Sequence, residues 1–363
     1  MRKKISFILL GLIMLAFSVS AKDLSPRRGP LLSYKIGVTQ ETRIQKIEDF
    51  LQLDKHYFDY LDAYAANCYF DLDILFWNAT NTGFPYYLKP THDVTDRTKA
   101  IIKRPSSEYD AGFRMGWGIK TPLDWDIYLQ ATHFSPSIKD HKSDPTGLNG
   151  PFSPAPFTKV NYKWKLEYNL FDLEIGRPFH LGKTISMRPF ICLRGGWMDQ
   201  KGTLKFTGPL AHVQHDANVP ATTYYKEDLW MIGPRTGFDL DFYIAHGISF
   251  YGNLAGSLLY GETKPYLRNT YTNSITHQEV VDVELDSTEY SDLKANLQAA
   301  IGLAWGGFIH KDFVAMRVRA GWEANYWWNQ NHEFINIPPG GTGFYYNQPV
   351  IIQGLVLSSA VYF

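Results

Sequence analysis

Apolar and polar side chains alternate along ten segments of the chain, from residue 67 to the last residue. In the segment 109–120, Phe113 and Trp117 fall on one face, whereas Arg114 and Gly116 fall on the other. Successive side chains of a β-strand point to opposite faces, so a period of two predicts strands. The predicted strands are 67–77, 109–120, 124–134, a segment that begins at 160, 185–197, 228–242, 248–260, 293–305, 314–328 and 350–363.

The connections between these strands alternate in length. The short ones are 121–123, 176–184, 243–247 and 306–312, and the long ones are 78–108, 135–159, 198–227, 261–292 and 329–349. A soluble sandwich has no reason to sort its loops in this way, whereas a transmembrane barrel has short turns at one end and long loops at the other. We therefore expect an all-β fold, a transmembrane up-and-down antiparallel β-barrel of about ten strands, with both termini in the periplasm.

The fourth segment changes phase along its length. Trp164 belongs to its apolar face, and Lys163, Lys165 and Glu167 belong to its polar face, but the alternation is reversed from Phe171 onward. An extra residue in one strand of a pair shifts the phase in this way, so a β-bulge is predicted there.

Two kinds of stretch do not fit this scheme. Residues 42–61 have apolar residues at helical spacing and predict a short helix, either periplasmic or a plug of the barrel. The pieces 31–38, 203–206 and 281–285 alternate but are too short to span a membrane, so they extend strands beyond it or raise the count to twelve.

The first residues have the order of a secretory signal. Three basic residues precede an apolar run from Ile5 to Phe17, and small residues follow up to Ala21. The predicted organisation is a signal peptide at 1–21, a periplasmic or plug segment at 22–65 and an outer-membrane barrel at 66–363.

Composition narrows the class of protein further. Without the leader, 33 basic residues face 36 acidic ones, which argues against nucleic acid as a partner. No later apolar run approaches the ~20 residues of a membrane-spanning helix, so a secreted soluble β-protein and a barrel remain. Cys68 is predicted to point outward and Cys192 inward, so we expect both to be unpaired.

Aromatic residues favour the barrel. The direction of each predicted strand places one group of tryptophans at the periplasmic rim and a second group at the opposite rim, as in the two aromatic girdles of a bilayer-spanning barrel. The predicted girdle residues are Trp117, Trp125 and Trp305 at the periplasmic rim, Trp164, Trp197, Trp230 and Trp328 at the other, and the terminal Phe363.

Charged residues concentrate on the predicted inward face. A charge on the lipid face costs about 2–4 kcal/mol at the midplane, so charges belong in a wet lumen or in paired networks. The lumen is either a pore wall with opposed charges or a closed interior laced with ion pairs. The predicted pore-lining residues are Asp71, Asp73, Arg114, Asp126, Lys163, Lys165, Glu167, Arg188, Arg194, Arg235, Asp239, Asp241, Lys294, Arg317, Arg319 and Glu323. Arg317 and Arg319, with Lys294 on the preceding strand, are candidates for a cationic constriction.

Three motifs resemble the Legionella-type major outer-membrane protein family. They are WKLEYNLFDLEIGRPFHLGKTISMRPFICLRGGWMDQ at 164–200, WMIGPRTGFDLDFYIAHGISFYGNLAGSLLYG at 230–261 and RAGWEANYWWNQN at 319–331. The resemblance covers residues 68–363 and implies a pore-forming barrel. It carries over no catalytic residues, and the segment 42–61 lies outside it.

We expect a channel for passive diffusion of ions and small hydrophilic solutes, located in the cell outer membrane. The alternative is a structural or adhesive barrel whose loops bind a host or envelope partner and which has no open pore. No enzyme activity, cofactor or metal is expected. His212 and His215 could form a metal pair, but they fall in a predicted external loop, where solvated side chains are the simpler interpretation. The expected partners are outer-membrane lipid and lipopolysaccharide, small solutes, and the barrel-assembly machinery through the C-terminal strand; a homo-oligomer is left open.

Overall fold

The structure is a computed structural model. It describes residues 68–81, 87–90, 100–121, 125–149, 156–182, 184–209, 221–272, 276, 278–286, 288–310, 314–335 and 344–363. These residues belong to one compact unit, Asp54–Phe363. The predicted signal peptide, the segment 22–65 and its helix at 42–61 lie outside the described residues. In the described part of the chain, no helix is long and apolar enough to cross a membrane.

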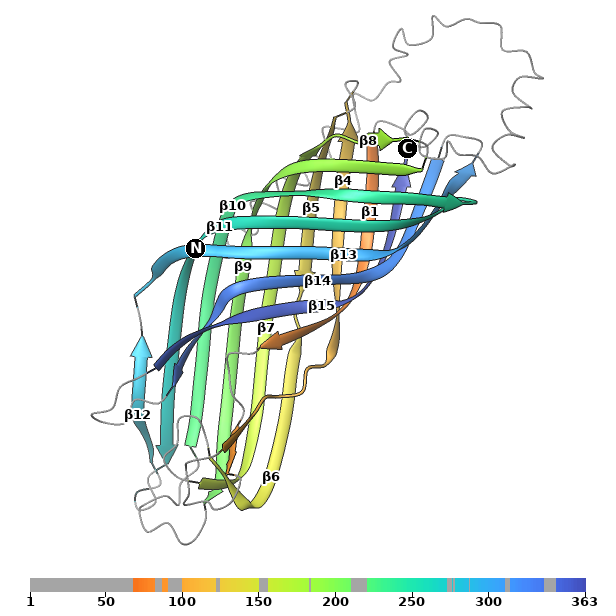
Figure 1. Cartoon of the computed structure of the whole chain (residues 1–363). Coiled ribbons are helices and arrows are strands. Elements are labelled where there is room, and N and C mark those ends of the chain that lie inside the picture. Colours follow the sequence, from red (N-terminus) through yellow and green to blue (C-terminus); the bar gives the residue numbers. More distant parts are fainter. Residues whose placement is uncertain are drawn as a thin grey trace, which may run out of the picture. The chain divides into compact units, whose positions relative to one another are not determined.

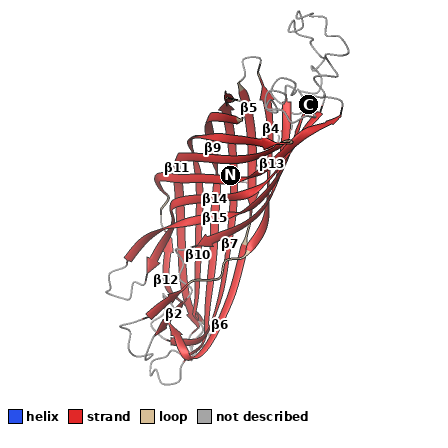
Figure 2. Ribbon diagram, turned by 45° about the vertical axis from the view of Figure 1, so that its right-hand side comes forward, coloured by secondary structure: helices blue, strands red, loops and turns tan. Residues whose placement is uncertain are grey.

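Ten antiparallel strands form a closed barrel (Figures 1 and 2). Each barrel strand pairs with the next one along the chain, and the last pairs with the first from Tyr69 opposite Tyr362 to Asn81 opposite Val350. Closure removes the free strand edges that would otherwise pair with other chains. The barrel strands are β1 (Cys68–Asn81), β4 (Tyr109–Lys120), β5 (Asp126–Phe134), β7 (Pro156–Gly176), β9 (Ile185–Pro209), β10 (Ala221–Ala245), β11 (Ile248–Thr272), β13 (Tyr290–His310), β14 (Val314–Ile335) and β15 (Phe344–Tyr362).

The other strands extend this ladder without entering the ring. They are β2 (Tyr87–Pro90), β3 (Ala100–Lys103), β6 (Ser137–Asn149), β8 (Phe179–Leu181) and β12 (Glu279–Asp286). β6 pairs with β7 beyond the end of β5, and β12 pairs with β11. The ring therefore closes with ten strands, and the predicted pieces 203–206 and 281–285 become part of β9 and part of β12.

The connections predicted to be short lie at one end of the barrel, and those predicted to be long lie at the other. Their lengths overlap, however, because the extended strands leave only 336–343 between β14 and β15, as many residues as 177–184 between β7 and β9. β10 and β11 are joined by the two residues His246 and Gly247, whose φ values are 53° and 79°. Positive φ at both positions is typical of the tightest hairpin turns. We call the end of the barrel with the short connections the short-loop end, and the opposite end the long-loop end.

Several strands are much longer than predicted. β9, β10 and β11 each contain 25 residues, whereas a membrane needs about 9 to 11. The additional residues lie at the long-loop end, where β6 and β12 also lie (Figure 1). Each strand was predicted to end where its outward-facing residues cease to be apolar. The extensions beyond that point were therefore missed.

The predicted bulge at Phe171 is wrong. The pairing of β7 with β9 continues through Leu170 opposite Gly196 and Phe171 opposite Gly195 without a shift. Every even-numbered side chain from Val160 to Gly176 is buried inside the barrel. The side chains thus keep the same inward and outward alternation along the whole strand. What changes along the strand is the polarity of the environment inside and outside the barrel.

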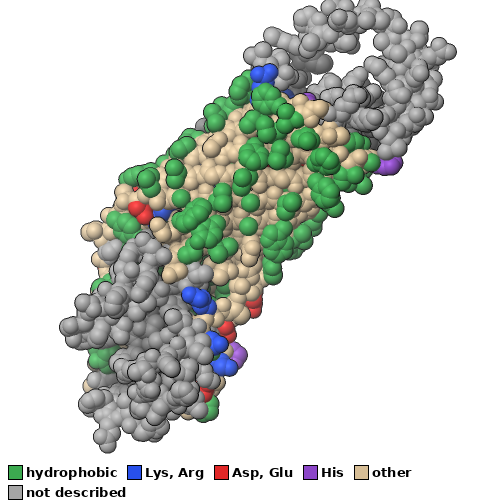
Figure 3. Space-filling model, in the orientation of Figure 1, with side chains coloured by type: hydrophobic (Ala, Val, Ile, Leu, Met, Phe, Trp, Pro, Cys, Tyr) green, Lys and Arg blue, Asp and Glu red, His purple; other side chains and the backbone are tan. Residues whose placement is uncertain are grey.

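The outward face explains this reversal. On β10, the outward residues from Trp230 to Phe242 are mostly apolar. We call the outward surface of the barrel at this height the apolar belt. Trp230 and Phe242 are twelve positions apart, which is about 40 Å along a strand. At a strand tilt of about 40° this becomes about 30 Å along the barrel axis, which is the thickness of a hydrocarbon core. Hydrophobic side chains cover the upper part of the face in Figure 3, while most visible charges lie toward its lower end.

Candidate functional site in the barrel lumen

The lumen at the level of the apolar belt holds clusters of paired charges. Arg114 on β4 reaches across the lumen to Glu323 on β14, with two hydrogen bonds of 2.7 and 2.9 Å, and also contacts Asp73 on β1 at 3.2 Å. All three residues are buried. A bidentate arginine–carboxylate pair combines two charge-assisted hydrogen bonds, so this cluster links β4 to β14 over the two strands, β1 and β15, that separate them.

A second cluster surrounds Arg188 near the short-loop end. Its guanidinium donates to Asp126 at 2.6 and 2.8 Å, to Glu174 at 3.1 Å and to Asp239 at 3.0 Å. The carboxylates come from β5, β7 and β10, while Arg188 itself lies on β9. Glu174 also accepts from Arg235 at 2.6 Å, which links this cluster to the next one.

The third cluster lies deeper in the barrel, close to the edge of the apolar belt. Arg194 on β9 forms two 2.7 Å hydrogen bonds with Asp172, which is directly opposite on β7. Its remaining nitrogen, Nη1, donates to Asn296 at 2.8 Å, and Nη2, which also bonds Asp172, donates to Gln298 at 3.2 Å; both acceptors lie on β13, which is separated from β9 by β10 and β11. Arg194 is 2% exposed, and each nitrogen of its guanidinium forms at least one of these hydrogen bonds, as expected for a buried polar group.

The proposed cationic constriction does not assemble. Arg317 pairs with Asp241, and the Arg319 guanidinium lies 5.6 Å from the centre of the Tyr251 ring. Lys294 is ten positions along β13 from Ala304, the residue that pairs with Arg319. The three basic residues therefore lie at different heights in the barrel.

A cavity of about 230 Å³ remains among these clusters. Its wall includes Lys120 and Tyr362 at the short-loop ends of their strands, and Glu323 and Gln298 deeper in the barrel. Two predicted lumen residues, Arg194 and Lys294, are not part of that wall. The cavity is confined to the half of the lumen that contains the charged clusters.

Inward glycines make room for large polar side chains in this half. A Cβ at Gly116 would overlap the Tyr128 hydroxyl, and a Cβ at Gly118 would overlap the Tyr69 ring. The stacked rings of Tyr69 and Tyr128 lie 5.6 Å apart. Aromatic side chains thus occupy the space over these two inward glycines.

Beyond Arg114 the lumen becomes apolar. The Arg114 guanidinium lies 5.3 Å from the Trp77 ring, which marks the change. Trp77, Trp164 and Trp327 are completely buried, and Tyr168 contacts the Trp77 and Trp327 rings edge to face at 6.4 and 6.0 Å. We call this part of the lumen the apolar core; it consists of Leu75, Trp77, Ala79, Tyr87, Phe134, Ile138, Leu148, Phe157, Val160, Tyr162, Trp164, Leu166, Tyr168, Leu170, Met198, Leu204, Phe206, Tyr225, Leu229, Met231, Leu259, Leu267, Trp327, Val350, Ile352 and Val356.

Four predicted positions need correction because of the reversal at Phe171. Lys163, Lys165 and Glu167 point outward into solvent and do not line the lumen, whereas Trp164 points inward and cannot belong to a girdle. Above the belt water lies outside the barrel and the core lies inside, so polar residues face outward there. The other thirteen predicted lumen residues do point inward.

The same error hid two carboxylates of the lumen. Asp172 and Glu174 are buried in its charged half, together with the buried Tyr128 and the half-buried Tyr69. The alternation of β7 continued from Phe171 toward Gly176 would have found the two carboxylates. Tyr69 and Tyr128 share the inward phase of Asp71 and Asp126 in the sequence, but they were left out of the predicted pore lining because they carry no charge.

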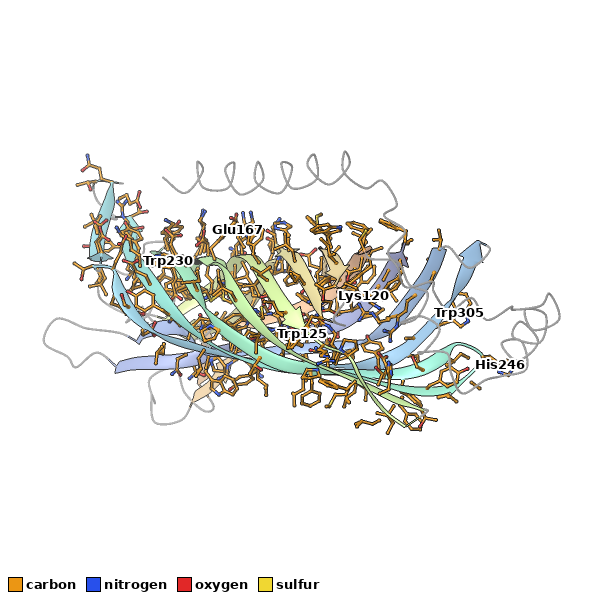
Figure 4. The ribbon with its side chains drawn as sticks, turned by 90° about the horizontal axis from the view of Figure 1, so that it is seen from above. Lys120, Trp125, Glu167, Trp230, His246 and Trp305 are labelled. Carbon is orange, nitrogen blue, oxygen red and sulfur yellow. The ribbon has the colours of Figure 1, made fainter. Side chains whose placement is uncertain are left out.

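The remaining predicted girdle residues lie on the outward face. Trp197 and Trp230 are directly opposite each other on β9 and β10, at the upper edge of the belt. The Trp230 indole donates to Glu262 at 2.7 Å and contacts Tyr260 at 5.9 Å. Figure 4 shows Trp305 at the end of the barrel opposite Trp230. Trp117, Trp125, Trp328 and Phe363 also have outward, partly or fully exposed side chains.

Cysteine and histidine chemistry adds no site in the described residues. Cys68 and Cys192 are both free, as predicted. The histidines 212 and 215 lie outside the described residues, and within those residues no group of three or more His, Cys, Asp or Glu side chains is arranged to hold a metal ion.

Comparisons with known proteins agree with this architecture. A family model described as Legionella pneumophila major outer membrane protein precursor matches residues 64–341. No curated protein matches the chain.

Solved structures similar to this chain include three outer-membrane proteins. The outer membrane protease OmpT from Escherichia coli has 8% identity and a TM-score of 0.41, covering 82% of this chain and 96% of that chain. A Pseudomonas aeruginosa FadL homologue has 8% identity, a TM-score of 0.23 and coverages of 81% and 89%. Ail, the attachment invasion locus protein of Yersinia pestis, has 11% identity, a TM-score of 0.18 and coverages of 81% and 97%.

These structural likenesses are too distant to indicate an activity. The family match covers most of the chain, and the closed ten-stranded barrel with its apolar belt is the fold expected in that membrane. The chain therefore belongs to the Legionella pneumophila major outer membrane protein family and is a β-barrel of the cell outer membrane.

Proposed function

We propose that this protein is a closed outer-membrane barrel that serves as a rigid platform on the cell surface, with its long loops available to bind partners. The observation that carries the proposal is the apolar core. Trp77, Trp164 and Trp327 are completely buried inside the barrel, so no water-filled path crosses the lumen at their height. An interior packed like that of a soluble protein excludes water.

The length of the strands supports a platform. On β10, the segment from Ala221 to Leu229 lies above the belt and extends about 27 Å along the strand. Its inward face adds Tyr225 and Leu229 to the apolar core beside the buried polar residues Thr223 and Glu227, and its outward face is polar. A barrel that only had to cross a membrane would have no use for such an extension, whereas a surface platform gains height and rigidity from it.

A diffusion pore is the second candidate. It is supported by the cavity of about 230 Å³ in the charged half of the lumen. A pore would require the apolar core to move aside. The ion pair from Arg114 to Glu323 and the hydrogen bonds from Arg194 to Asn296 and Gln298, which link non-adjacent strands, would have to break as well. The packed geometry thus favours the closed platform. No catalytic role is part of the proposal, because the buried charges in the lumen pair with one another.

Conductance in planar bilayers separates the two candidates. The parent protein is expected to give no stepwise conductance over the usual range of voltage. The double variant Trp164→Ala, Trp327→Ala removes two large rings from the apolar core, so it is expected to raise the conductance above that of the parent.

The matched control is the double variant Trp322→Ala, Trp328→Ala. It loses the same side-chain volume from outward positions that are 43% and 41% exposed, and should remain silent. Heat-dependent electrophoretic mobility verifies that each variant is folded. Stepwise conductance of the folded parent would overturn the closed barrel in favour of the pore.

A further inference from the structure

Lysines gather in register on the outer surface, above the apolar belt. Lys165 on β7 is directly opposite Lys201 on β9, which is directly opposite Lys226 on β10. All three side chains point outward, and those of Lys165 and Lys226 are 45% and 36% exposed. Like charges directly opposite each other destabilise a sheet, so this row requires an explanation.

The next two rows outward continue the pattern. Lys163 is opposite Lys139 on β6 and opposite Thr203 on β9, and Lys201 and Lys205 flank Thr203 on the same face. Diagonal neighbours of this kind are about 7–8 Å apart. We call the outward surface formed by these lysines the lysine face; its members are Lys139, Lys163, Lys165, Lys201, Lys205 and Lys226. The twelve outward residues of the three rows on β6, β7, β9 and β10 include these six lysines and no acidic residue.

Only part of this charge is neutralised within the protein. Lys165 pairs with Glu167 at 2.9 Å, and Lys226 pairs with Asp228 at 2.5 Å, both in the row beneath. Four members, Lys139, Lys163, Lys201 and Lys205, form no ion pair with any residue that the structure describes. An excess of positive charge therefore remains on one side of the barrel.

The lowest row of the lysine face, that of Lys165, Lys201 and Lys226, lies just above the polar layer of a membrane, and the rows of Lys163 and Lys205 lie farther out. Lys201 follows Trp197 by four residues, about 13 Å along the strand and about 10 Å along the tilted barrel axis. The headgroup layer beyond each side of the hydrocarbon core is about 5–8 Å thick. Lysine side chains are long and flexible enough to bend back toward that layer from above.

We propose that the lysine face binds the phosphate groups of lipid headgroups in the leaflet that surrounds the long-loop end. Continuity with the belt singles out lipid as the occupant, because Trp197 and Trp230 lie on the same strands as Lys201 and Lys226, separated from them only by the row of Glu167, Asp199 and Asp228. The bound phosphates would offset the repulsion among the lysines. Lipid association at this face does not depend on whether the lumen conducts, so its test is separate from that of the closed barrel.

The test uses the full-length protein reconstituted in vesicles of brominated lipid, which quenches tryptophan fluorescence. Enrichment is measured as quenching by brominated phosphatidylglycerol relative to brominated phosphatidylcholine. The parent should favour the anionic lipid by about threefold or more at low salt, and the preference should decline as the Debye length falls from about 10 Å at 0.1 M salt to about 3 Å at 1 M.

Three variants identify the residues responsible. Lys163→Gln, Lys201→Gln, Lys205→Gln should reduce the preference to near unity, whereas the same three changes to Arg should preserve it. The control Lys103→Gln, Arg104→Gln removes two charges from exposed positions outside the lysine face and should behave as the parent.

Two outcomes would overturn the proposal. One is an equal loss of preference in the Gln variant and the control, which would show that the preference follows the net charge of the protein and not the lysine face. The other is binding of soluble inorganic polyphosphate by the detergent-solubilised parent, lost in the Gln variant, without any enrichment of anionic lipid. That result would make a soluble polyanion the partner.

Discussion

Arg194 shows how single residues stabilise the membrane-level lumen. Its guanidinium is satisfied by Asp172, Asn296 and Gln298, and hardly any of it reaches solvent. A buried charge without its partner is costly, so every member of such a cluster depends on the others.

The Arg194→Leu variant is therefore expected to lower the free energy of unfolding by about 3–5 kcal/mol, because it leaves the Asp172 carboxylate buried and unpaired. The measurement is urea unfolding in lipid vesicles. Lys165→Leu is the control, since its 2.9 Å pair with Glu167 is solvent-exposed and such pairs contribute about 0–1 kcal/mol. Equal effects of the two substitutions would show that the cluster around Arg194 is hydrated.

Glycines give a second residue-scale prediction. Gly116→Ala places a methyl group against the Tyr128 hydroxyl and Asp71, and overpacking of this kind costs about 1–3 kcal/mol. At Gly252 the nearest atom to an added methyl group is the Ala300 carbonyl oxygen at 3.8 Å, so Gly252→Ala should be close to neutral. The same unfolding assay compares the two, and a neutral Gly116→Ala would mean that Tyr128 has room to move.

At the scale of the element, β7 carries the transition between the two environments. Its outward face holds Leu173 and Ile175 within the belt and Lys163 and Lys165 beyond it, while its inward face changes from Asp172 and Glu174 to the apolar core. The alternation stays constant along the strand, but inside and outside exchange polarity at the membrane surface.

Charge substitutions on one face of β7 test where that surface lies. Leu173→Arg exposes a charge to lipid and is expected to destabilise the barrel by about 2–4 kcal/mol. Asn161→Arg makes a similar change on the same face of the same strand, but beyond the belt, and is expected to have little effect. The measurement is the free energy of unfolding in vesicles. A larger loss of stability for Asn161→Arg than for Leu173→Arg would show that lipid surrounds the barrel at the height of Asn161 and not at the belt.

At the scale of the whole molecule, the topology predicts which connections face the exterior. Protease added to intact cells should cut within the connections 150–155 or 210–220 and spare the turn at His246 and Gly247. The fragments can be identified by mass spectrometry. Cleavage at the turn in intact cells, with 210–220 protected, would invert the barrel in the membrane.

The sequence by itself determined the ring. A period of two along ten segments, together with the alternation of short and long connections, requires neighbouring strands to be antiparallel and in chain order. These are local properties, since the direction in which each side chain points follows from the backbone. Thirteen of the sixteen predicted lumen residues point inward for the same reason.

Only the tertiary structure decided what fills the ring. A polarity pattern cannot distinguish a polar residue in a wet lumen from a polar residue in water outside, and so Lys163, Lys165 and Glu167 were placed on the wrong face. The distinction depends on the height of each residue relative to the membrane, which emerges only when the register aligns Trp197 with Trp230. Whether side chains of non-adjacent strands meet in the lumen, as Arg114 and Glu323 do, depends on residues far apart in sequence, so the sequence pattern alone left both a pore and a closed barrel open.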